Sequence, residues 1–137
     1  MNGLYALTIR YFLVLLLMLL LTGLWMLIEQ TGFEIVQLTD HYAKKGLLGL
    51  LETISPHLFA MGTVVFVVTH FLALEKENTR VESVMSTLLF VVMLFSNLSA
   101  FFISYESLLF SWVKLLSILF FFLFLLFVML RVFFRTK

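Results

Sequence analysis

Two histidines in an apolar stretch are the side chains of this sequence best suited to chemistry. His57 and His70 lie within residues 55–75, a segment of membrane-spanning length that is otherwise mostly apolar. Imidazole is a common ligand for haem iron and other metals. On a straight helix the two rings are separated by about 20 Å and by a turn of about 220°, so they leave the helix on nearly opposite sides. The spacing could place one cofactor near each membrane face.

Several roles are consistent with these histidines. A b-type haem would need a second axial ligand from another helix, a dimer partner or a methionine, and the candidate methionines are Met18, Met26, Met61, Met85 and Met93. His57 and Met61 are one helical turn apart, which gives a copper(I) site as a less favoured alternative. The leading interpretation is structural, with His57 at the membrane interface and His70 hydrogen-bonded to a neighbouring helix. Proton or quinone chemistry is a further alternative, and the identity of any metal stays open.

The composition indicates that the protein is embedded in a membrane. Hydrophobic residues make up 63% of the chain and charged residues only 12%, and the mean hydropathy is +1.13. Ordinary soluble domains are about 45–50% apolar and about 25% charged. We therefore expect an all-α integral membrane protein, with four transmembrane helices in an antiparallel bundle and an interfacial amphipathic segment between the first two helices.

The hydropathy pattern divides a single membrane domain, residues 1–137, into spans and connections. The helices are expected at about 9–28, 56–74, 83–103 and 107–132. Between them lie an outer interfacial segment at 29–55 and an inner turn at 75–82, and an inner tail follows at 133–137. Ser55 and Pro56 resemble the start of the second helix, since serine is a favoured N-cap and proline a favoured first residue.

Other features exclude several classes of function. The chain has no cysteine, which rules out disulfides, iron–sulfur ligation and cysteine nucleophiles, and its net charge of +1 provides no basic surface for nucleic acid. It carries no serine–histidine–carboxylate arrangement, phosphate-binding glycine loop or metalloprotease helix signature. An independent enzyme is therefore not expected.

The positions of the cations predict the orientation. With four spans both termini share one side, and that side collects Arg10, Lys76, Arg80, Arg131, Arg135 and Lys137. The opposite side has Lys44 and Lys45, with Lys114 just inside the fourth helix. Because lysine and arginine accumulate on the cytoplasmic side, we expect both termini inside, in a cytoplasmic membrane of bacterial type.

Polar residues within the spans predict an outward-opening polar pocket. At similar depths in the outer half of the membrane we place, with His57, the side chains of Thr22, Asn97, Ser104, Ser111 and Lys114. Buried polar groups in a membrane normally face other helices or a cavity. Lys114 is expected to extend outward toward Glu106.

Three functions remain open at this point. The first is a non-catalytic subunit or homo-oligomeric bundle of a cytoplasmic-membrane assembly, in contact with lipid and with copies of itself or other membrane subunits. The second is an electron-transfer or quinone-side subunit that binds b-type haem through His57 or His70. The third is a small transporter or channel that uses the polar pocket.

Overall fold

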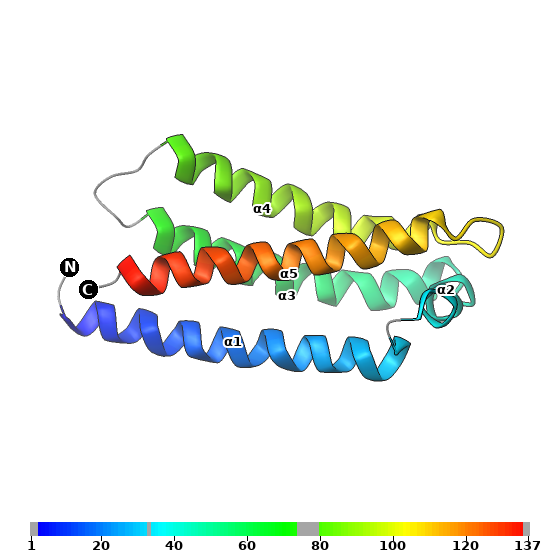
Figure 1. The fold of residues 1–137 in the computed structure, drawn as a ribbon, viewed down its shortest axis with the longest axis horizontal. Coiled ribbons are helices and arrows are strands. Elements are labelled where there is room, and N and C mark those ends of the chain that lie inside the picture. Colours follow the sequence, from blue (N-terminus) through cyan, green and yellow to red (C-terminus); the bar gives the residue numbers. More distant parts are fainter. Residues whose placement is uncertain (1–2, 33, 74–79, 136–137) are drawn as a thin grey trace.

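The computed structural model describes residues 3–32, 34–73 and 80–135, and this part of the chain is almost entirely helical. Four of its helices are long and apolar enough to cross a membrane. They run side by side, and α1 and α5 have their Gly3 and Arg135 ends at the same end of the molecule (Figure 1). The predicted four-helix membrane fold is confirmed.

The chain forms five α-helices and one short 3₁₀ helix in the described ranges. They are α1 (Gly3–Thr31), α2 (Ile35–Ala43), α3 (Leu47–Ala73), α4 (Arg80–Leu98), η1 (Ser99–Phe102) and α5 (Leu109–Arg135). The membrane-spanning ones are α1, α3, α4 (extended by η1) and α5.

Each long helix contributes an apolar stripe to one core. In α1 the buried residues Ala6, Ile9, Leu13 and Leu16 recur every three or four positions, which is the spacing of one helical face. They meet similarly spaced residues of the other long helices, among them Val65, Val68, Leu89, Leu125 and Val128. The opposite faces of the long helices expose many large apolar side chains, as expected for a bundle that lies in lipid.

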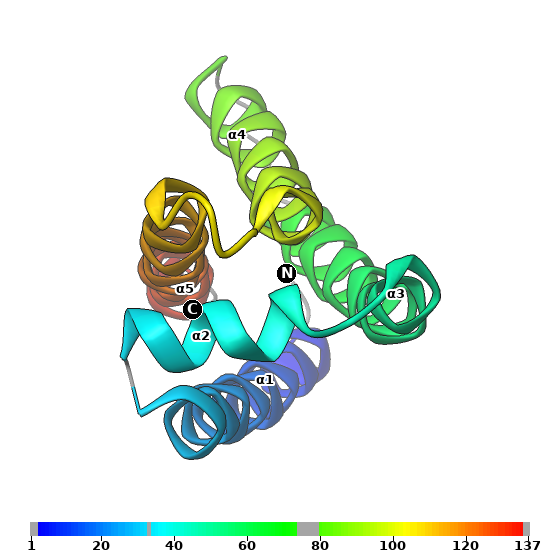
Figure 2. The same cartoon turned by 90° about the vertical axis from the view of Figure 1, so that its right-hand side faces the viewer.

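The short helix α2 lies across one end of the bundle, roughly perpendicular to the long helices (Figure 2). It is amphipathic, with Leu38 1% exposed and Val36 67% exposed. Gly32 lets the chain leave α1, because its φ of 54° is a conformation that favours glycine. Helix α2 therefore forms the interfacial segment that the sequence predicts between the first two spans.

The predicted start of the second span is wrong. Helix α3 begins at Leu47, so Ser55 is not its N-cap and Pro56 lies inside it. Leu50 and Ile54 pack against Ala100, and this burial holds the helix together across the proline. The segment 47–54 is therefore helical and continuous with the second span.

The other boundaries differ by several residues. Helix α1 extends beyond the expected 9–28 at both ends, and α5 continues to Arg135, so that part of the expected inner tail is helical. Helix α4 begins at Arg80, within the expected turn, and residues 74–79 of that turn lie outside the described residues. Helix α4 ends at Leu98, because the chain tightens into η1 before reaching Ile103.

Candidate functional site

Buried polar residues gather where α2 crosses the bundle. We call Thr39, Ser96, Asn97, Ser111 and Lys114 the Lys114 cluster; each is at most 5% exposed. They come from α2, α4 and α5. The hydroxyls of Thr39 and Ser111 lie 2.7 Å apart, which ties α2 to α5 through a buried hydrogen bond.

Lys114 has an unusual position for a lysine, because it is buried and does not extend toward Glu106 as expected. Its ammonium donates a hydrogen bond to the backbone carbonyl of Ser96 and lies 5.4 Å from the centre of the Tyr42 ring. Ser96 is in the last turn of α4, where carbonyls lack helical partners and carry the negative end of the helix dipole. Lys114 therefore caps the end of α4.

Only part of the predicted polar pocket comes together. Asn97, Ser111 and Lys114 share the cluster, and the Asn97 amide donates to the Met93 carbonyl at 2.9 Å and to the Met61 sulfur at 3.5 Å. Thr22 is exposed and its hydroxyl donates to Leu19 of its own helix, while Ser104 pairs with Ser107 in the turn before α5. Thr39 and Ser96 were missed, because Thr39 is in the connecting segment and Ser96 follows no polar stripe recognised in the sequence.

The two histidines lie apart from each other, and His57 is close enough to Lys114 for their charges to interact. His57 and His70 are both exposed on α3, and within the described residues neither imidazole has a hydrogen-bond partner. His70 stacks on Phe66, with ring centres 6.4 Å apart. Among those residues no group of three or more histidine, cysteine, aspartate or glutamate side chains could hold a metal ion.

A second buried polar group lies at the opposite end of the bundle. Glu82, which is 2% exposed, accepts hydrogen bonds from Arg135 at 2.5 Å and from Arg131 at 3.5 Å. These arginines are one turn apart on α5, so one carboxylate of α4 binds two guanidinium groups. We call these three residues the Glu82 cluster. No pattern in the sequence distinguishes Glu82 from the other charged residues of the predicted turn.

The surface of α2 carries its own charge network outside the spans. Lys44 donates to Asp40 at 2.5 Å, and this hydrogen bond, supported by one from Tyr105, lowers the pKa of Asp40. Lys45 contacts His41 Nε2 at 3.1 Å and donates to Thr53 of α3 at 3.0 Å. Burial, followed by the positive charge of Lys45, lowers the pKa of His41 from 6.5, so His41 is neutral at pH 7.

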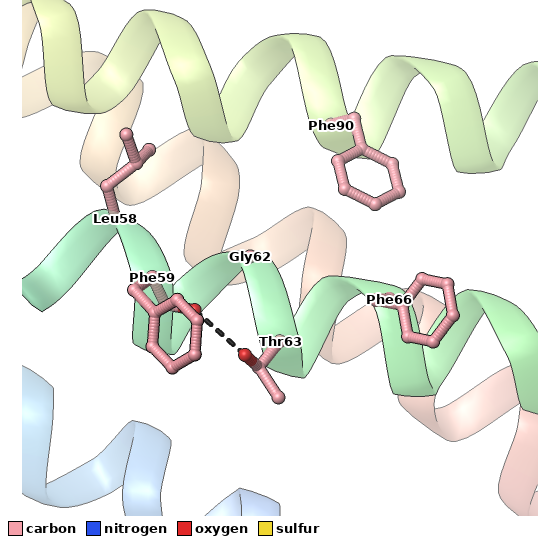
Figure 3. A pocket seen from close by; sticks show the side chains of 6 residues that line it. All are labelled: Leu58, Phe59, Gly62, Thr63, Phe66 and Phe90. Carbon is pink, nitrogen blue, oxygen red and sulfur yellow. Dashed lines mark hydrogen bonds between the residues drawn. The ribbon is translucent and has the colours of Figure 1, made fainter.

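An apolar groove lies between α3 and α4 on the outside of the bundle. It has a volume of 350 Å³ and is lined by Leu58, Phe59, Gly62, Thr63, Phe66 and Phe90 (Figure 3). The Thr63 hydroxyl donates to the Phe59 carbonyl at 2.9 Å, so it is satisfied within its own helix. The close view shows Gly62 at the floor of the groove, between the rings of Phe59 and Phe66.

The arrangement is that of a polytopic helical membrane protein with two buried polar clusters, and the comparison with protein families agrees. A family model described as a transmembrane helical domain matches residues 34–136, which extend from the start of α2 through α5. The chain belongs to this family. No curated protein and no solved structure matches it.

Proposed function

We propose that this protein is a non-catalytic subunit or homo-oligomeric bundle of a cytoplasmic-membrane assembly of bacterial type, with both termini inside. The observation that supports this role is the outward face of α3. In the span Leu47–Ala73, the exposed His57 lies about 5 Å from the middle, and the exposed His70 lies about 15 Å from it, at the edge of the roughly 15 Å half-thickness of the hydrocarbon. An exposed imidazole as deep as His57 favours contact with another protein over contact with lipid.

The neighbouring helices provide a contrast. The exposed residues of α4 include Val84, Leu88, Val91, Phe95 and Leu98, with Ser83 and Thr87 near its start, and those of α5 include Leu116, Phe120, Leu123, Phe127 and Leu130. Both faces are mostly apolar and suit lipid chains. Helix α3 exposes His57 and His70, and these two imidazoles distinguish its exposed face from those of its neighbours.

Purification in a mild detergent tests this proposal. We expect a defined oligomer or a co-purifying membrane protein, measured as the mass of the protein part by light scattering and by native mass spectrometry. A monodisperse monomer that brings no other protein with it would contradict the subunit role.

A second candidate function, binding of b-type haem, is favoured by the two imidazoles that have no hydrogen-bond partner in the described part of the chain. His57 and His70 could each supply one axial ligand, and Met61 is engaged elsewhere because its sulfur contacts Asn97 inside the bundle. Oxidised and dithionite-reduced absorption spectra of protein from haem-replete cells test this candidate, alongside His57→Ala and His70→Ala. A Soret band lost in one variant would support it, and a flat spectrum would end it.

Transport receives less support from the geometry. Lys114, Asn97, Ser111 and Thr39 bond to neighbouring helices and to one another in a buried cluster, whereas a substrate pathway needs polar groups that face an opening. Flux into liposomes that is lost in Asn97→Leu would revive this function.

A further inference from the structure

Four basic side chains gather around Tyr42 at the end of the bundle that α2 crosses (Figure 2). The ammonium groups of Lys45 and Lys114 lie 5.8 Å and 5.4 Å from the centre of the Tyr42 ring. The His41 imidazole lies 5.0 Å from the same ring, and His57 is within electrostatic reach of Lys114. We call these five residues, which come from α2, α3, α5 and the connection after α2, the Tyr42 site.

The basic groups of the Tyr42 site have no acidic partner. Among the described residues, neither the two lysines nor the two histidines form an ion pair with a carboxylate. Asp40, the carboxylate next to His41 in the chain, is paired with Lys44 instead. Positive charges held close together repel each other unless an anion offsets them. The charges of Lys45 and Lys114 therefore favour an anionic ligand.

Lys45 and His57 border one face of α3. The Lys45 ammonium lies 3.0 Å from the Thr53 hydroxyl, and His57 is one helical turn, about 6 Å, beyond Thr53 on the same face. A hydrogen bond to a phosphate oxygen spans about 3 Å, so a single phosphate group can reach both side chains. A ligand can also approach them from outside, because Lys45 is partly exposed and His57 is exposed.

The remaining residues of the site position Lys45 and add charge. His41 Nε2 lies 3.1 Å from the Lys45 ammonium, and the Tyr42 ring packs against a small apolar cluster of α3 and η1, which holds it in place. Lys114 is 5% exposed and donates one hydrogen bond to the Ser96 carbonyl. It therefore contributes mainly a fixed positive charge beneath the surface.

We propose that the Tyr42 site binds a phosphate group, which Lys45 and His57 contact directly and the buried charge of Lys114 attracts. Phosphate suits the site because its oxygens accept charge-assisted hydrogen bonds from several directions. The site lies beside the interfacial helix α2, at the depth of lipid headgroups, so the phosphate group can belong to an anionic lipid or to free phosphate. All five residues come from one copy of the chain, so the site does not depend on the proposed subunit role.

Thermal unfolding of the full chain in detergent tests binding of the free ion. Sodium phosphate is titrated while sodium chloride keeps the ionic strength constant, and we expect the melting temperature to rise to a plateau. Lys45→Met and His57→Gln should each raise the phosphate concentration needed by about tenfold or more, and Lys45→Arg, which keeps the cation, should retain the response. Lys44→Met is the matched control, because Lys44 is exposed and pairs with Asp40, and it should respond as the unmodified protein does.

Reconstitution into nanodiscs tests the lipid headgroup. The protein is placed in phosphatidylcholine alone or in an equal mixture with phosphatidylglycerol, transferred to detergent, and examined by native mass spectrometry for lipid that it retains. A lipid ligand predicts that bound phosphatidylglycerol is lost in Lys45→Met and kept in Lys44→Met.

Two results would overturn the proposal. One is the absence of both a phosphate-dependent shift and retained phosphatidylglycerol. The other is an equal response of Lys45→Met and Lys44→Met to the same probe, which would place the anion elsewhere on the protein. A response to one probe alone, lost in Lys45→Met, supports the site and identifies its ligand as free phosphate or as lipid, and a response to both shows that the site accepts either.

Discussion

Lys114 shows how one buried cation can be stabilised in a bundle without a carboxylate beside it. Its ammonium donates to the Ser96 carbonyl and lies over the Tyr42 ring, so the end of α4 and an aromatic face take the place of a counter-ion. The Ser96 carbonyl also accepts a hydrogen bond from the Ser99 hydroxyl at 3.0 Å, so two donors meet it where α4 tightens into η1. Lys114 therefore stabilises the end of α4 as well as forming part of the buried cluster.

Replacing Lys114 with methionine tests this account. Methionine keeps a long unbranched side chain and removes the donor, so we expect Lys114→Met to lower the free energy of unfolding by about 1–3 kcal/mol. The fluorescence of Trp25 and Trp112 during thermal unfolding in detergent measures the effect. Lys44→Met, at an exposed position, should change stability by less than about 0.5 kcal/mol. If Lys114→Met were the more stable protein, the cost of burying the ammonium would exceed the benefit of the cap.

Glu82, in contrast to Lys114, is a buried anion with two cationic partners, because its carboxylate lies between two guanidinium groups. Glu82→Gln leaves Arg131 and Arg135 close together without the negative charge that offsets them. Removing one member of a buried ion pair costs about 3–5 kcal/mol, and since both arginines are partly exposed we expect a loss near 3 kcal/mol, measured by thermal unfolding. Glu106→Gln, on an exposed turn, is the control and should have little effect.

At the scale of the element, α2 is held to the bundle by contacts that depend on pH. Neutral His41 can accept a hydrogen bond from Lys45, which also binds Thr53 of α3. Protonation removes that acceptor and places the imidazolium beside the ammonium of Lys45, with the Tyr42 ring centre 5.0 Å from the imidazole.

Acidification should therefore loosen α2. Because the pKa of His41 in the folded protein lies below its ordinary value of 6.5, the unfolded chain binds the proton more readily, and stability should fall as the pH drops below about 6.5. His41→Gln should remove this dependence between pH 7.5 and 5.5, as measured by melting temperature. An unchanged slope in the variant would assign the effect to other groups, such as Asp40 at lower pH.

Helices whose location depends on hydropathy could be predicted from the sequence, whereas boundaries that depend on tertiary contacts could not. The spans and the interfacial helix follow from runs of apolar residues, which the bilayer requires to be helical. The start of α3 was mispredicted because Ser55–Pro56 is a good local start signal, yet Leu50 and Ile54 bury against Ala100 one turn and more before it. A local preference was overridden by packing that no single stretch of sequence reveals.

At the scale of the whole molecule, the same limit applies to the polar sites. Depth along each helix can be estimated from residue number, which is why the prediction placed Asn97, Ser111 and Lys114 at similar depths. The rotation of each helix about its own axis cannot be estimated from residue number. The prediction therefore placed Thr22 in the pocket, although its side chain is exposed. The exposed face of α3 could be recognised only once the bundle showed which residues its own core leaves uncovered.

The orientation of the bundle is the last property to follow from its charges. Arg10, Arg131 and Arg135 lie at the end where α1 begins and α5 ends (Figure 1), opposite Lys44 and Lys45 near α2. The topology rule counts lysine and arginine and gives little weight to acidic residues, so the pairing of Arg131 and Arg135 with Glu82 does not alter the expectation that this end faces the cytoplasm.

In intact cells a membrane-impermeant maleimide should label Gln37→Cys on α2 and Glu106→Cys before α5. Asn78→Cys, between α3 and α4, should react only after the membrane is permeabilised, and the reverse pattern would mean that α2 lies on the cytoplasmic side.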